Sequence, residues 1–195
     1  PDLLDCCPPG IIASSGMDAL TQAIESFLSN GASWFSDQLA LKAAELINAS
    51  LEAVFSGKKE FSPGLLEGSY LAGIALSNAR LGLVHGLVHP LGARFHVPHG
   101  LACAACLPYV LEFNRDTVPE KYRMLRSVLG KDPVRRANEM LANMGIVSPF
   151  SGKVLTDKEA VIRETLSSGS TKANPRKVTA KDVESVLNKI FATHR

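Results

Sequence analysis

The sequence predicts an all-α fold. Apolar residues recur along most of the chain at the spacing of one helix face, as Leu20, Ile24, Phe27 and Leu28 do near its start. The alternation of apolar and polar residues that indicates strands is hard to find over about four or more positions. A chain of 195 residues is long enough to bury one hydrophobic core, so we expect a single domain over 1–195.

Helices are expected over 16–29, 33–55, 65–79, 81–91, 99–112, 119–129, 133–144, 158–167 and 180–192. Residues 1–15 are expected to be irregular, because the Pro-Pro-Gly of residues 8–10 is a breaker, and Ser14 or Ser15 then caps the first helix. The helix over 65–79 is apolar nearly all round, which is typical of a helix at the centre of a domain.

Turn and capping signals set the later boundaries. Pro90 lies near the end of the helix over 81–91, and Gly92 is expected to stop that helix. Residues 168–176 are expected to form a loop. Thr179 and Asp182 then have the spacing of a capping box at the start of the last helix.

Composition excludes several classes of partner. The formal net charge is only +2 and aromatic residues make up 6% of the chain, so the sequence does not predict nucleic-acid binding. No apolar run of about 18 residues predicts a membrane span, and no secretory leader is recognised. Cys103 and Cys106 are most simply small apolar residues on a buried helix face. Without a disulfide framework we expect a reducing, cytoplasmic compartment.

Four of the five histidines, His85, His89, His96 and His99, cluster in a short stretch rich in Gly and Pro. Imidazole binds transition metals and transfers protons near neutral pH, so this stretch is the leading candidate for a site. His85 and His89 share a helix face, and His99 can fold back toward them from the next helix. Asp18, on a polar stripe of the first helix, is a candidate carboxylate ligand, but sequence spacing alone does not bring it to the histidines.

These residues also have purely structural interpretations. His85 and His99 can be satisfied core histidines, and Asp18 a carboxylate that the helix dipole favours in a first turn. His96 is most simply a loop residue, and the fifth histidine, His194, is expected to have no role.

Several ordered segments resemble the iron-containing alcohol dehydrogenase family. They are 16–25 (GMDALTQAIE), 71–79 (LAGIALSNA), 82–100 (GLVHGLVHPLGARFHVPHG), 107–114 (LPYVLEFN) and 174–176 (NPR). The resemblance covers nearly the whole chain and corresponds to the family's multi-helix C-terminal domain, of the dehydroquinate synthase-like fold. The family's N-terminal dinucleotide-binding domain has no counterpart here. Because the chain also opens on Pro1 rather than Met, we expect a fragment of a longer protein.

The resemblance implies a set of site residues. The family's four metal ligands fall on Asp18, Gln22, His85 and His99, and Gln22 stands where the usual pattern has histidine. His89 corresponds to a histidine beside the metal and the nicotinamide, and we expect it to relay the proton of the alcohol. Two other positions depart from the family: His96 replaces a usual asparagine and Arg80 a common glycine.

The implied activity is oxidation of a small alcohol or reduction of an aldehyde. Fe2+, or Zn2+, would act as a Lewis acid on the substrate oxygen. NAD or NADP, held by the missing domain, would exchange the hydride. The isolated fragment is expected to be inactive, and the apolar surface left by a missing domain would favour a homo-oligomer.

Gln22 leaves three alternatives open, because a carboxamide oxygen is a weaker donor for iron or zinc than an imidazole nitrogen. Gln22 coordinates directly or through water, His89 or His96 supplies the missing nitrogen, or the site is metal-free, as in the related maleylacetate reductases. A metal-independent reductase is therefore the alternative within this fold. A non-catalytic helical scaffold remnant is the alternative of another class.

Overall fold

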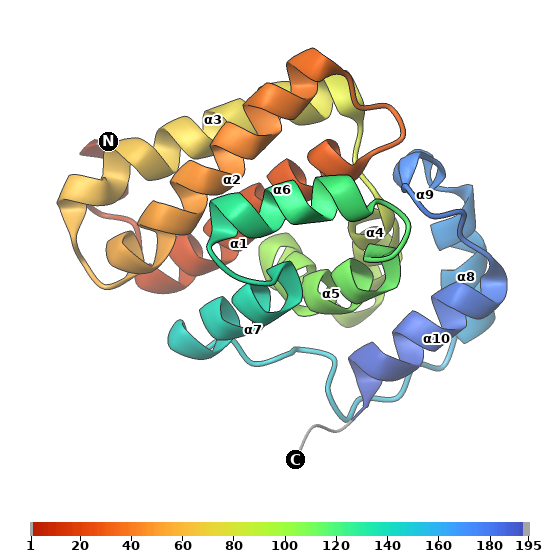
Figure 1. Ribbon diagram of the computed structural model, residues 1–195. Helices are drawn as coiled ribbons and strands as arrows, with labels where there is room; N and C mark the ends of the chain where they lie inside the picture. The colour runs from red at the N-terminus through yellow and green to blue at the C-terminus, as the bar shows by residue number, and fades with distance from the viewer. Residues whose placement is uncertain (1, 193–195) are drawn as a thin grey trace.

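Helix α1 (Pro9–Leu28) runs through the middle of the molecule in the computed structural model, which describes residues 2–192. Helices α2 (Trp34–Phe55), α3 (Ser62–Ala79) and α5 (His99–Asn114) pack against it (Figure 1). This central position matters for function, because α1 carries the predicted carboxylate ligand into the interior.

The remaining elements are α4 (Leu83–Phe95), α6 (Pro119–Leu129), α7 (Pro133–Asn143), α8 (Lys158–Ser167), α9 (Gly169–Ala173), α10 (Ala180–Phe191) and the short 3-10 helices η1 (Asp2–Leu4) and η2 (Lys59–Phe61). Helices α8, α9 and α10 gather on one side of α4 and α5 (Figure 1). Residues 2–192 contain no strand, so the predicted all-α fold is confirmed. Pro1 and residues 193–195, with His194, lie outside the described residues.

The apolar face predicted for the first helix lies in the core, together with buried residues from most of the other helices. Leu20, Ile24 and Phe27 are each at most 1% exposed, and fully burying one such side chain stabilises a fold by about 1.5–3 kcal/mol. The start of α5 approaches α1 so closely that a Cβ at Gly100 would lie 2.2 Å from the backbone oxygen of Ser14. This approach places the first turns of α5 directly beside α1.

Helix α3 does not occupy the centre, so that prediction was wrong. Its small residues form a buried stripe, and a Cβ at Gly68 would lie only 2.7 Å from Ile47 Cγ1 of α2. Its outer face is open, and Tyr70 is 70% exposed. An apolar composition on all sides shows that every face of α3 is suited to contact other residues. It does not show whether an element among the described residues covers each face.

Helix α1 begins at Pro9 rather than near Gly16, so the predicted irregular segment is too long. Proline is tolerated in a first helical turn, where its missing N–H is not needed. Ser14 therefore lies inside the helix, and its hydroxyl donates to the Ile11 carbonyl at 3.2 Å instead of capping.

Two later boundaries also differ from prediction. Helix α4 continues past Gly92 to Phe95, and Pro90 lies inside it. The short helix α9 forms within the predicted loop over 168–176, with the Ser168 hydroxyl accepting the Ser170 N–H as a cap.

Among residues 2–192, no single helix has both the length and the apolar character to cross a membrane. Lys59–Ala79 and Leu83–Phe95 meet both conditions only as a pair, and the chain bends by 103° between them.

Candidate metal centre

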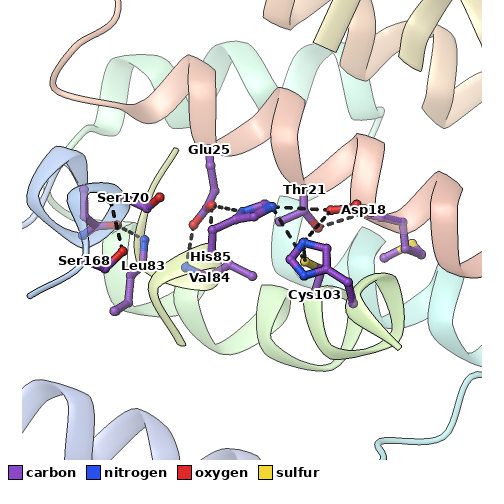
Figure 2. A network of polar contacts seen from close by, with 12 residues as sticks. Asp18, Thr21, Glu25, Leu83, Val84, His85, Cys103, Ser168 and Ser170 are labelled. Atoms are coloured by element: carbon purple, nitrogen blue, oxygen red, sulfur yellow. Dashed lines mark hydrogen bonds and ion pairs between the residues drawn. The ribbon is translucent and has the colours of Figure 1, made fainter. Parts of the chain in front are cut away.

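Three helices bring four potential metal ligands together, and Figure 2 labels three of them, Asp18, His85 and Cys103. Asp18 comes from α1, His85 from the first turn of α4, and His99 and Cys103 from the first turns of α5. Their ligand atoms all lie within 4.8 Å of one another. The fold therefore joins Asp18 to the two histidines, which sequence spacing alone does not do.

The distances between the donor atoms are short. Asp18 Oδ1 lies 3.4 Å from His85 Nε2 and 3.7 Å from His99 Nε2. Cys103 Sγ lies 3.8 Å from His85 Nε2 and 3.6 Å from His99 Nε2. All four groups thus face one common point between α1, α4 and α5.

His85 is held in place by Glu25, which lies two turns after Asp18 on α1. Glu25 Oε2 lies 2.7 Å from His85 Nδ1. The same carboxylate accepts the backbone N–H of Val84 at 2.6 Å and that of His85 at 3.4 Å. These N–H groups have no partner within α4, and a negative charge is favourable at this end of a helix.

The contact with Glu25 also decides which nitrogen of His85 faces the cluster. With Nδ1 donating to the carboxylate, Nε2 faces Asp18 and can offer its lone pair to a metal once it loses its proton, as in the carboxylate–histidine–metal arrangements of metalloproteins. Figure 2 shows the imidazole between the two carboxylates. Glu25 is therefore a residue that orients His85, and it is 5% exposed.

Asn174 supports the start of α4 from the other side. Its Oδ1 accepts the Leu83 N–H at 3.2 Å, and the amides of Asn114 and Asn174 bond to each other at 3.0 and 2.8 Å. Gly82 makes room for this packing, because a Cβ there would lie 2.8 Å from Glu25 Oε1 and 3.1 Å from Asn174 Oδ1. The segment 174–176 thus lies directly behind the start of α4.

Burial and mutual contacts within the cluster shift the pKa values of its members. Burial alone would lower the pKa of His85, but contacts with Asp18 and Glu25 raise that pKa to about 9. Burial would raise the pKa of Asp18, but its contact with His85 and the charge of His99 bring it below the usual range. Burial and the charge of Asp18 raise the pKa of Cys103. The apo cluster therefore favours a protonated His85 paired with an ionised Asp18, with a positive charge in the place where a cation would sit.

The donor set fits a divalent transition metal. Asp18 Oδ1 is buried and accepts no hydrogen bond from any residue within 2–192, which is costly unless a cation or water satisfies it. One carboxylate oxygen, two imidazole nitrogens and one sulfur are donors that Zn2+ accepts. The side chain of His85 is 3% exposed and that of His99 is 43% exposed, so the cluster is closed on one side and open on the other.

His89 lies at the open side, one turn after His85 on α4 and exposed to solvent. Its ring centroid is 5.7 Å from that of His99, with the two rings stacked. Burial, with the charges of His99 and His85, lowers the pKa of His89. His89 is therefore beside the cluster without belonging to its donor set.

Gln22 and His96 lie outside the four-residue cluster. Gln22 is half-buried, one turn after Asp18 on α1. His96 is exposed and ends α4 in the left-handed conformation, with φ 50° and its N–H donating to the Gly92 carbonyl. Its role in the structure is that of a helix cap, which does not support it as the source of the missing nitrogen.

Positive φ angles explain which residues the family usually has at positions 80 and 96. Asparagine is tolerated in the left-handed conformation that His96 adopts. Arg80 has φ 66° and ψ −176°, a region that essentially only glycine occupies without strain. Histidine is also enriched in the left-handed conformation, so only the replacement by Arg80 adds strain to the backbone.

Sequence reasoning assigns no definite role to two residues of this site, although a spacing signal exists for each. It treats Cys103 as a small apolar residue, yet Cys103 lies four residues after His99 and so on the same face of α5. Glu25 lies seven residues after Asp18, on the same polar stripe of α1.

Comparison with known proteins gives a family match over nearly the whole chain. Residues 12–191 match the model described as "Fe-containing alcohol dehydrogenase family, C-terminal". Lactaldehyde reductase from Escherichia coli is 36% identical over 196 residues, which are 93% of this chain and 51% of that protein. The chain spans about half the length of the curated relatives it matches.

Solved structures share the fold. Sulfoacetaldehyde reductase from Bifidobacterium kashiwanohense, in complex with NAD+, matches with a TM-score of 0.91 and 26% identity, over 100% of this chain and 54% of that one. Maleylacetate reductase from Rhizobium sp. matches with a TM-score of 0.83 and 22% identity, over 97% of this chain and 55% of that one, a likeness of fold alone.

Proposed function

The chain belongs to the Fe-containing alcohol dehydrogenase family, and we propose that it is the helical metal-binding domain of a nicotinamide-dependent alcohol dehydrogenase or aldehyde reductase. In this proposal an N-terminal domain of the longer protein holds NAD or NADP, and a small alcohol or aldehyde binds in the cleft between the domains. The names of the relatives support the substrate class, since lactaldehyde reductase and sulfoacetaldehyde reductase are both named for small aldehydes. By itself, the chain is expected to turn over no substrate.

Asp18, His85 and His99 are the proposed metal ligands, with Gln22 beside them as a weak one. A bound Fe2+ or Zn2+ supplies Lewis-acid polarisation of the substrate oxygen. Glu25 fixes the imidazole of His85, so that Nε2 faces the cluster.

His89 is the proposed proton-handling residue. Its lowered pKa keeps the imidazole neutral near pH 7, so that it is able to accept the proton of an alcohol. It is exposed and stacks on His99 at the open side of the cluster, where it can pass that proton to water.

One observation carries the proposal: Asp18 Oδ1 is buried without a hydrogen bond from residues 2–192, while two imidazole nitrogens lie 3.4 and 3.7 Å from it. Such an arrangement is of little use to a hydrophobic core or a scaffold, because a buried carboxylate oxygen without a hydrogen-bond donor is destabilising unless a positive charge compensates it. A cation at this point would satisfy the carboxylate and both nitrogens together.

Metal analysis of the chain, purified without chelator, tests the proposal. The parent and the control Asp116→Ala, which removes an exposed carboxylate just beyond the end of α5 opposite to His99, are expected to hold about one divalent ion per chain. Asp18→Ala is expected to hold little metal. Equal metal contents in the two variants would contradict the assignment of Asp18.

A metal-independent reductase is the second candidate, because Gln22 stands where the family usually has histidine. The fold does not separate the two candidates, since the maleylacetate reductase shares it. If stoichiometric metal is absent and Asp18→Ala leaves the activity of the longer protein intact, the metal-independent candidate is correct. A parent reading frame without a dinucleotide-binding domain would instead favour the non-catalytic scaffold.

A further inference from the structure

We propose that the thiolate of Cys103 is the fourth protein ligand of the metal, and that the resulting set of two nitrogens, one oxygen and one sulfur selects Zn2+ over Fe2+. The inference rests on the proposed function in one respect, namely that the cluster holds a metal. It assigns to Cys103 the coordination position that Gln22 leaves without an imidazole.

The spacing of the donor atoms fits four ligands around one zinc ion, to which the substrate oxygen of the proposed function would add as a fifth donor. Zinc bonds of about 2.0–2.1 Å to nitrogen or oxygen and about 2.3 Å to sulfur place a ligand nitrogen about 3.3 Å from an oxygen and about 3.6 Å from a sulfur. The observed nitrogen–oxygen distances are 3.4 and 3.7 Å. The observed nitrogen–sulfur distances are 3.6 and 3.8 Å. One ion therefore reaches all four atoms after small side-chain movements.

The position of Cys103 in the fold suits a ligand. It lies one turn after His99, so both side chains project from the same face of α5 toward the same point. Its sulfur lies 3.8 Å from His85 Nε2 and 3.6 Å from His99 Nε2, and within 4.8 Å of the ligand oxygen of Asp18. Cys106 is equally buried, one turn farther along α5, but it does not belong to the cluster.

Sulfur ligation changes which ion the site prefers. A thiolate is a softer donor than a carboxylate or a carboxamide, and soft donors favour Zn2+ over Fe2+. On binding, the thiol proton of Cys103 passes to solvent, because a coordinating thiol is deprotonated by the ion. The negative charges of Asp18 and Cys103 then balance the divalent charge. The side chain of Gln22 offers neither this charge nor this softness.

Cobalt substitution of the full chain tests the inference, because Co2+ replaces Zn2+ in tetrahedral sites and a sulfur ligand gives a charge-transfer band in the near ultraviolet. The band is expected in the parent and in the triple variant Cys6→Ser, Cys7→Ser, Cys106→Ser, in which Cys103 is the sole thiol. That variant keeps the test valid even if substitution at Cys103 impairs folding.

Cys103→Ser and Cys103→Ala are expected to lose the band and to bind zinc more than about 10-fold more weakly, since even groups behind the ligands change metal affinity by about 10- to 100-fold. In anaerobic competition between the two ions, the parent is expected to bind Zn2+ more tightly than Fe2+. In Cys103→Ser the ratio of the two affinities is expected to be smaller.

The outcomes separate the two proposals. A metal-loaded parent without the band, or a Cys103→Ser variant with unchanged spectrum and zinc affinity, overturns the ligand assignment and leaves the proposed function standing. A parent that binds neither zinc nor cobalt overturns both.

Discussion

Glu25→Gln is the most direct perturbation of the candidate site, because it keeps the size of the side chain while removing its charge and one acceptor. The carboxylate receives three donors: the Val84 N–H at 2.6 Å, the His85 N–H at 3.4 Å and His85 Nδ1 at 2.7 Å. A carboxamide has one accepting oxygen, and its NH2 group would face at least one of these donors.

The expected loss of stability in Glu25→Gln has two parts: a lost hydrogen bond to a charged partner, and a buried donor left without an acceptor. A hydrogen bond to a charged partner contributes about 1.5–3 kcal/mol, and a buried donor left without an acceptor costs about 1–3 kcal/mol. We expect Glu25→Gln to lower the free energy of unfolding of the apo chain by about 3 kcal/mol. Zinc affinity is expected to fall by about 10- to 100-fold, because Glu25 sets the orientation of His85.

Urea denaturation and zinc competition titration measure the two effects. The matched control is Glu112→Gln, which removes an exposed pair with Lys189 at 2.8 Å and is expected to change stability by less than about 1 kcal/mol. If Glu25→Gln changes stability and zinc affinity no more than Glu112→Gln does, then Glu25 does not orient His85 and the reasoning fails.

Two further predictions concern the apo chain. The pKa of His85 rises from 6.5 to about 9 in the fold. The stabilisation from its positive charge is therefore fully present below about pH 6.5 and is lost as the pH passes about 9. Urea denaturation should show a lower free energy of unfolding at about pH 10 than at about pH 7, by at most about 3 kcal/mol from this group. An equal pH slope in His85→Gln would contradict this. Arg80→Gly should raise the unfolding free energy by about 1 kcal/mol, because relief of about 1–3 kcal/mol of backbone strain exceeds the entropy cost of glycine, about 0.5–1 kcal/mol. A lower urea midpoint would refute it.

Periodicity predicts the helices because each helix has to bury one face, whatever its partners are. The stripe of Leu20, Ile24 and Phe27 is buried as expected. Periodicity says less about where a helix lies in the domain, and so α3 was placed at the centre while Tyr70 is exposed. Boundaries fail for another reason: Pro9 is compatible with a helix start and with a turn, and only the packing of α1 decides between them.

Sequence and resemblance predict part of the candidate site, namely the ligands Asp18, His85 and His99. His85 and His99 belong to one short stretch of sequence, and the resemblance adds Asp18. Asp18 is far from both in sequence, although its Oδ1 lies 3.4 Å from His85 Nε2 in the fold. Glu25 and Cys103 follow from helical spacing once a partner on the same helix is known. Their chemical use is not visible in sequence, because it depends on how α4 crosses α1 and on which atoms of His85 face each side.

Asp18 and Glu25 explain why one helix controls this site. They lie seven residues apart, which is two turns or about 10.5 Å along α1, and on the same face. The imidazole of His85 lies between them, with Nε2 toward Asp18 and Nδ1 toward Glu25 (Figure 2). Gln22 occupies the intervening turn, so replacing an imidazole there removes one donor without disturbing either contact of His85. Cys103 approaches from α5 and does not depend on the residue at this turn. These two facts favour a metal site with an altered ligand set over loss of the site.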